Sequence, residues 1–143
     1  MGKAILADLL DKNKLSASVT VDAAAIADPH HATVSPSAVK AIAEIGCERW
    51  IEAHRPRKLC PYLQERADLI IAVTDRPLAR GTNSSNKVVT DKELFGIRIS
   101  NPYPDNQDDE SLEKYRKVRD EMKRLINEKL DEILERAGAI PVV

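Results

Sequence analysis

The stretch Leu69-Ile70-Ile71-Ala72-Val73 is short, uninterrupted and largely β-branched, and it decides the fold class of this 143-residue chain. A run of this kind is typical of a strand that is covered on both faces, as in a parallel sheet. A short helix is predicted before it, over Pro61 to Arg66, and a second short strand after it, over Lys87 to Thr90. Strands that alternate with helices indicate an α/β domain.

Three amphipathic helices are predicted outside the segment of residues 61–90. Lys3 to Lys12 carries its apolar residues on one stripe. Ser35-Pro36 suits the N-cap and first position of a second helix, which Gly46 is placed to end. Ser111 to Ala137 keeps a helical period throughout, and Gly138 follows it as a stop.

Two further strands complete the predicted sheet. Ser16 to Val21 alternates between apolar and polar residues, and Ile97 to Ile99 is a short β-branched candidate. With no internal repeat and no second domain, residues 1–143 are expected to form a single domain. We expect an α/β three-layer sandwich with a small, mostly parallel sheet.

The composition argues against several classes of protein. Aromatic residues make up 3% of the chain and the formal net charge is −1, which argues against a nucleic-acid partner. The apolar run over residues 69–73 is too short to span a membrane, and acidic residues in the first helix exclude a signal peptide. Two cysteines cannot form a secreted disulfide framework, so a cytoplasmic location is expected.

Several short strings occur in a recognisable order: Ser35-Pro36-Ser37-Ala38-Val39, Glu44-Ile45-Gly46, His54-Arg55-Pro56-Arg57-Lys58-Leu59, Ala67 to Val73, Asn101-Pro102-Tyr103 and Ser111-Leu112-Glu113-Lys114-Tyr115-Arg116. This order resembles the low-molecular-weight protein tyrosine phosphatases, whose fold is shared by the thioredoxin-coupled arsenate reductases. The resemblance spans nearly the whole chain. It implies the phosphatase fold and, in intact members, hydrolysis of phosphomonoesters through a cysteine nucleophile.

The resemblance also implies that the catalytic loop lies outside this sequence. Family members begin with a central strand and a phosphate-binding loop that reads Cys, five residues, Arg; a helix follows. Met1 to Leu6 resembles the opening of that helix, so the strand and the loop would lie before residue 1. We therefore expect a catalytically inactive protein with this fold, either a binding or regulatory module or an orphan. The alternative is an N-terminally truncated phosphatase whose cysteine is encoded upstream.

The residues that resemble the family's Asp-Pro-Tyr loop depart from its pattern. Asn101 stands where the family has the general-acid Asp, and an amide cannot titrate. Asp105 is a poor substitute because Pro104 and the changed spacing separate it from that position. Pro102 and Tyr103 remain candidates for a substrate-contacting loop. In addition, Ala23 and Ala25 stand where the family usually has Ser and Gly beside the phosphate loop.

Both cysteines have structural interpretations. Cys60 to Arg66 satisfies the pattern Cys, five residues, Arg, but it contains no Gly to form a cradle and Glu65 would repel an anion. We expect Cys60 to cap a helix or to be buried near its start. Cys47 is expected to be a small buried thiol.

The adjacent histidines His30 and His31 are expected to lie on the surface. Neither a metal nor a cofactor is predicted.

Partners are expected to be a phosphorylated protein or a small phosphomonoester. The basic segment His54 to Lys58 is interpreted as a solvated connector, with attraction of a phosphorylated partner as the alternative. A sheet without the family's first strand would expose the edges of Ser16–Val21 and Leu69–Val73. We expect these strands to pair directly, or a second copy to fill the gap, with Ile140 to Val143 as the candidate segment of a homo-oligomer.

Overall fold

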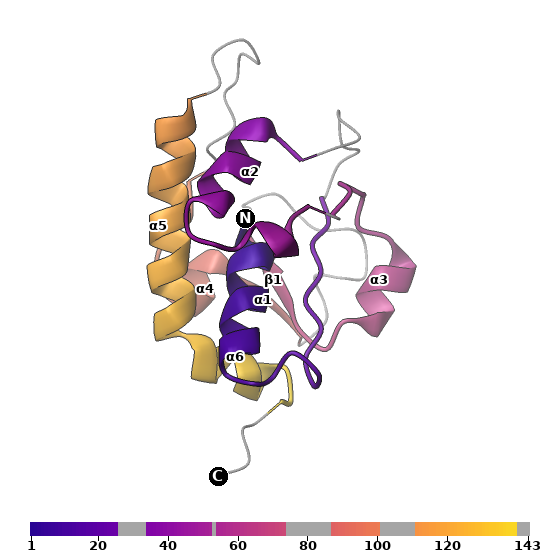
Figure 1. The fold of residues 1–143 in the computed structure, drawn as a ribbon. Helices are drawn as coiled ribbons and strands as arrows, with labels where there is room; N and C mark the ends of the chain where they lie inside the picture. Colours follow the sequence, from indigo (N-terminus) through magenta and orange to yellow (C-terminus); the bar gives the residue numbers. More distant parts are fainter. Residues whose placement is uncertain (26–33, 53, 74–86, 101–110, 140–143) are drawn as a thin grey trace.

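The computed structural model describes residues 1–25, 34–52, 54–73, 87–100 and 111–139 (Figure 1). Its elements, in chain order, are α1 (Gly2–Lys12), α2 (Pro36–Ala43), the 3-10 helix η1 (Glu48–Trp50), α3 (Pro61–Arg66), β1 (Ile70–Ala72), β2 (Val88–Thr90), α4 (Asp91–Phe95), α5 (Leu112–Glu128) and α6 (Leu130–Arg136). The α/β class with a small parallel sheet is confirmed, and helices dominate the described part.

The sheet in the described residues consists of β1 and β2, which pair in parallel with Ile70 opposite Val88 and Ala72 opposite Thr90. The two strands predicted over Leu69–Val73 and Lys87–Thr90 are thereby confirmed. Helix α1 contributes Ala4 and Ile5 to the main core. The other members come from α2, from the ends of η1, from β2 and from the helices that follow it: Ile42, Cys47, Ile51, Val89, Leu94, Ile126 and Ile133. The core therefore joins the first helix to the sheet and to the C-terminal helices.

Helices α1 and α2 form where the sequence predicted them. Helix α1 begins at Gly2 and buries Ala4, Ile5 and Leu10. Ser35 occupies the N-cap of α2 and Pro36 its first position. The helix ends at Ala43, three residues before the predicted stop, and Gly46 follows in the left-handed region at φ 76°. Glycine enters that region without the steric cost that a Cβ imposes.

Two predicted strands are wrong. Ser16 to Val21 forms turns and irregular backbone, and no ladder partner lies beside it among the described residues. Alternation of side chains allows a strand, but the extended backbone needs hydrogen bonds from a neighbour to persist. Ile97 to Ile99 follows α4 as a bend and irregular backbone, with Ile99 held by a side chain instead. Direct pairing of Ser16–Val21 with Leu69–Val73 is accordingly not observed.

The helix predicted over Ser111 to Ala137 divides into α5 and α6. The division falls at Lys129, whose φ of −107° and ψ of 12° leave the helical region. Both halves bury apolar residues, including Leu125 on α5 and Ile133 on α6, so the apolar period continues across the break. The spacing of apolar residues remains helical on both sides of Lys129, so the sequence pattern does not indicate the break between α5 and α6.

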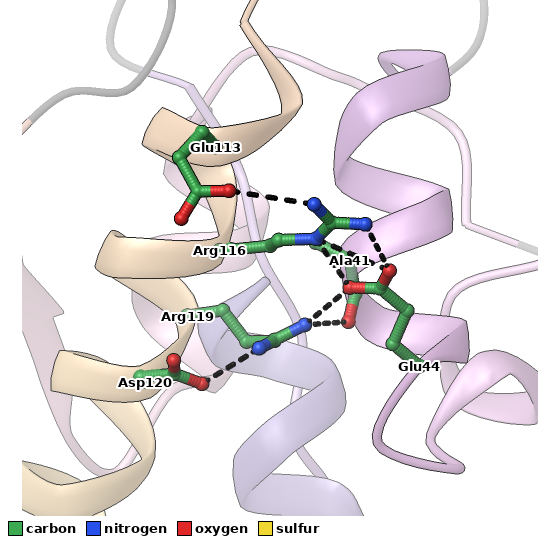
Figure 2. A network of polar contacts seen from close by, with 6 residues as sticks. All are labelled: Ala41, Glu44, Glu113, Arg116, Arg119 and Asp120. Atoms are coloured by element: carbon green, nitrogen blue, oxygen red, sulfur yellow. Dashed lines mark hydrogen bonds and ion pairs between the residues drawn. The ribbon is translucent and has the colours of Figure 1, made fainter.

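A polar network joins α2 to α5 (Figure 2). Arg119 donates to the carbonyl oxygen of Ala41 at 2.9 Å and to the Glu44 carboxylate at 2.7 Å. Arg116 donates to both Glu44 oxygens, through Nε at 2.9 Å and Nη2 at 2.6 Å. The Arg116 hydrogen bonds, and after them those of Arg119, lower the pKa of Glu44 to about 2, although burial raises it. The network holds the C-terminal end of α2 against α5.

Strand β1 is less covered than its apolar sequence predicts. Val73, which follows it, keeps 45% of its surface exposed, whereas Ala72 is buried. Coverage on both faces is thus confirmed only in part. The prediction that a second copy supplies a strand here stays a prediction, and its candidate segment, Ile140–Val143, lies outside the described residues. None of the helices in the described ranges is long and apolar enough to cross a membrane.

Candidate functional site

The Cys60 to Arg66 segment is helical. Cys60 is the N-cap of α3, and the N–H of Gln64 donates to its carbonyl oxygen at 3.0 Å. Arg66 lies at the far end of the same helix, where its guanidinium contacts Tyr62 through the hydroxyl oxygen and the ring face. The expectation of a helix start is confirmed, although the Cys60 side chain makes no capping hydrogen bond. This segment does not form a loop of convergent backbone N–H groups.

Cys47 is buried between α1 and η1, as expected, with 4% of its surface exposed. Burial raises the pKa of the Cys47 thiol, and the neighbouring carboxylate of Asp8 raises it further. Burial also raises the pKa of Asp8, but hydrogen bonds from Lys12, Trp50 and Cys47 outweigh this effect and lower it. A thiol held protonated in this way is a poor nucleophile.

Charged side chains gather at the start of α1. Lys3 Nζ donates to Nδ1 of His54 at 3.0 Å and lies 3.7 Å from the carboxylate of Asp22. The same carboxylate forms an ion pair with Arg57. We call these four residues the α1-start cluster. A short parallel bridge between Ala25 and Lys58 aligns the two segments and thereby brings Asp22 next to Arg57.

Positive charge exceeds negative charge in the α1-start cluster. Burial lowers the pKa of Lys3, and the charge of Arg57 lowers it further. The pKa of the Met1 α-amino group is lowered by burial and by Lys3. Burial, Lys3, the α-amino group and Arg55 together lower the pKa of His54. Asp22 is the carboxylate placed among these cations, so the electrostatics of the cluster favour an anion.

His54 is therefore more than part of a solvated connector. It is half-buried and packs its ring against Lys3, whereas Arg57 and Lys58 are exposed. The sequence identified the basic segment His54–Lys58 but gave no signal for Lys3 or Asp22 as its partners. Lys3 and His54 are 51 residues apart, and only the fold brings them together.

The loop with the substituted general acid lies outside the described residues: Asn101, Pro102, Tyr103 and Asp105 are not placed, nor are His30 and His31. The described backbone leads toward that loop at Ile99, whose N–H donates to the buried carboxylate of Asp91 at 2.9 Å. Asp91 has no exposed surface and also accepts from the N–H of Lys92 at 2.9 Å. In the residues that are placed, no three His, Cys, Asp or Glu side chains are grouped to hold a metal.

Comparison with known proteins supplies the family. A sequence model described as "Low molecular weight phosphotyrosine protein phosphatase" matches residues 1–138. This chain belongs to the low molecular weight phosphotyrosine protein phosphatase family. No match was found among curated proteins. The resemblance drawn from the ordered strings is thereby confirmed at the level of family and fold.

Solved structures of this phosphatase family share the fold. A low molecular weight protein tyrosine phosphatase from Bacillus subtilis is 24% identical, with a TM-score of 0.73 over 94% of this chain and 87% of that one. The corresponding enzyme from T. tengcongensis is 21% identical, with a TM-score of 0.73 over 92% and 88%. The YwlE arginine phosphatase from Geobacillus stearothermophilus is 27% identical, with a TM-score of 0.69 over 93% and 84%.

Proposed function

We propose that these 143 residues form a phosphatase-fold binding module that recognises a phosphoryl group without hydrolysing it. The placement of the two thiols carries this proposal. Hydrolysis through a cysteine requires a thiolate next to phosphorus, with backbone N–H groups and an arginine on the phosphate oxygens. Cys47 is buried beside a carboxylate and Cys60 begins a helix, and the sequence contains no third cysteine.

The geometry of α3 argues against Cys60 as the nucleophile. Six helical residues span about 9 Å along the axis, so Cys60 and Arg66 do not converge on one phosphate group. The N–H groups of Gln64 and Ala67 are already bonded within the helix and its cap. Asn101 supports the same conclusion from the sequence, because an amide cannot protonate a leaving group.

The α1-start cluster is the proposed recognition site. Lys3 and Arg57 supply positive charge beside the first turn of α1, whose N–H groups also favour an anion. Related structures are described as tyrosine and arginine phosphatases. We therefore take phosphotyrosine or phosphoarginine on a partner protein, or a small phosphomonoester, as the ligand class.

The first experiment tests the absence of hydrolysis. The 143-residue chain is incubated with p-nitrophenyl phosphate and compared with a Cys47→Ser/Cys60→Ser double variant. We expect both proteins to release nitrophenolate at the same background rate. A faster release by the unaltered chain that disappears in Cys60→Ser alone would overturn the proposal, because it would make α3 a catalytic segment.

The second experiment tests phosphoryl recognition. Phenyl phosphate is titrated into the labelled protein while backbone amide NMR shifts are recorded. We expect saturable shifts at Lys3, His54 and Arg57, and a loss of affinity of roughly threefold to tenfold in Lys3→Gln and in Arg57→Gln. Lys40→Gln, an exposed cation on α2, is the matched control and should bind as the parent does. Unsaturable shifts, or equal losses in all three variants, would contradict recognition at the cluster.

A second candidate function is phosphomonoester hydrolysis by a longer chain whose cysteine is encoded upstream of Met1. One observation favours it: the comparison covers 94% of this chain but 87% of the Bacillus subtilis phosphatase. Reading the coding DNA upstream in frame decides between the candidates. A Cys, five residues, Arg sequence there, together with activity of the extended protein, would support the enzyme; an in-frame stop codon would exclude it.

A further inference from the structure

A groove of about 450 Å³ runs between α1 and α5, two helices that pack side by side and run in the same direction (Figure 1). Helix α1 contributes Ile5, Asp8, Leu9 and Lys12. This i, i+3, i+4, i+7 spacing places all four residues on one helix face over about 10 Å. Lys3 lies on the opposite face of α1, where it lines a separate cavity with Ala7 and Leu10.

Helix α5 presents the same spacing across the groove, through Asp120, Lys123, Arg124 and Asn127. Two stripes of equal length thus face each other for two helical turns. The turn after α2 closes the space with Ile45 and Cys47. The volume is within the range of small-molecule pockets.

The floor of the groove is apolar. Ile5 and Cys47 each keep 4% of their surface exposed, and Leu9 and Ile45 are half-buried around them. These side chains give the groove an apolar lining that a hydrocarbon group can contact. Since the Cys47 thiol is held protonated, it contributes to the floor as a small apolar group.

Charged side chains of α1 and α5 form the rim of the groove. The acidic ones have closer ion-pair partners than the basic ones of α5. Asp8 accepts from Trp50 at 3.2 Å and pairs with Lys12 at 2.9 Å. Asp120 pairs with Arg119 at 2.8 Å. Lys123, by contrast, forms no ion pair in the described part of the chain, and its charge acts on Cys47. Arg124 has only an exposed pair with Glu128 at 3.4 Å, which water screens.

We propose that this groove binds a small amphipathic anion. An aromatic or aliphatic body lies on the floor formed by Ile5 and Cys47, and a carboxylate or sulfonate lies at Lys123 and Arg124. Both carboxylates of the rim already have cationic partners, so an entering anion meets the two α5 cations. The site is separate from the α1-start cluster and does not depend on phosphoryl recognition.

The test uses two probes that differ in charge. 8-Anilinonaphthalene-1-sulfonate carries an anion on a naphthalene body, and N-phenyl-1-naphthylamine has the same body without the charge. We expect the sulfonate to bind the 143-residue chain more tightly, by roughly threefold to tenfold. Backbone amide shifts should concentrate on residues 5–12, 45–47 and 120–127. Equal affinity of the two probes would remove the proposed role of the cations.

Variants separate the groove from general charge effects. Lys123→Gln/Arg124→Gln should abolish the preference for the sulfonate, whereas Lys117→Gln, which removes an exposed cation of α5 outside the groove, should retain it. Shifts in the unaltered protein that concentrate on Lys3, His54 and Arg57 would overturn the proposal, because the anion would then occupy the other cluster. The absence of saturable sulfonate binding would overturn it as well.

Discussion

Lys3 donates a hydrogen bond to His54, with 3.0 Å between Nζ and Nδ1. The contact requires an unprotonated Nδ1, and burial together with nearby positive charge lowers the pKa of His54 accordingly. It fastens the first turn of α1 to the segment that follows η1. The state of one imidazole is therefore coupled to the docking of the N-terminal helix.

Acidification should weaken this coupling. Because the pKa of His54 is lower in the folded protein than its ordinary value of 6.5, the unfolded chain takes up the proton first. The contribution of His54 to stability is thus complete above about pH 7.5 and is lost as the pH falls through about 6.5 toward the folded pKa. Urea unfolding from pH 8 to pH 5 measures it. His54→Gln keeps an acceptor that does not titrate and should show a flatter profile; identical slopes would contradict the prediction.

Glu44 should control stability at lower pH. Its pKa of about 2 is below the ordinary 4.5, so its contribution is present above about pH 4.5 and is lost as the pH falls toward 2. We expect Glu44→Gln to lower the melting temperature at pH 7 and to lose part of the acid dependence. Glu48→Gln, at an exposed carboxylate on η1, is the control. Equal melting temperatures for the two variants would show that the polar network between α2 and α5 does not contribute to thermal stability.

Asp91 should be sensitive to loss of one acceptor atom. Its two oxygens accept from the N–H groups of Lys92 and Ile99 in a fully buried position. Asp91→Asn leaves an amide donor facing one of these donors, which should destabilise the fold by about 1–3 kcal/mol. Chemical denaturation measures the change. Asp68→Asn, at an exposed aspartate, should change stability by less than about 0.5 kcal/mol.

The main core should depend on Ile42. This side chain on α2 is fully buried and packs with residues of α1, β2 and α5. Ile42→Ala should lower the free energy of unfolding by about 2–5 kcal/mol, through lost burial and the cavity that remains. Val73→Ala removes a side chain that is 45% exposed and should cost clearly less. Similar losses for the two variants would place the core elsewhere.

Local signals in the sequence predicted the local structure. The Ser35-Pro36 opening, the β-branched run at Leu69–Val73 and the stripe of α1 all lie where expected. Helix α4 was missed although its signal was present: Thr90 and Glu93 form a capping box, in which Thr90 Oγ1 accepts from the Glu93 N–H at 3.1 Å. The pattern Thr, two residues, Glu directly after a predicted strand would have indicated this helix.

Features that depend on distant partners were not predictable. The alternation in Ser16–Val21 describes side chains, whereas a strand also needs a neighbour for its backbone. Likewise, Glu44 is an ordinary exposed glutamate in the sequence, and its two arginine partners lie 72 and 75 residues away. The α1-start cluster has the same origin, because Asp22 and Arg57 meet only where two separate segments align.

The helical form of α3 also has a consequence for chemical proteomics. A search for the string Cys, five residues, Arg retrieves this polypeptide because of Cys60 and Arg66, which lie at opposite ends of one helix. An electrophilic inhibitor designed around that string that reacted with Cys60 would therefore modify a half-buried thiol at a helix N-cap. Occupancy by such a compound would report access to the start of α3 and not engagement of a phosphate-binding loop.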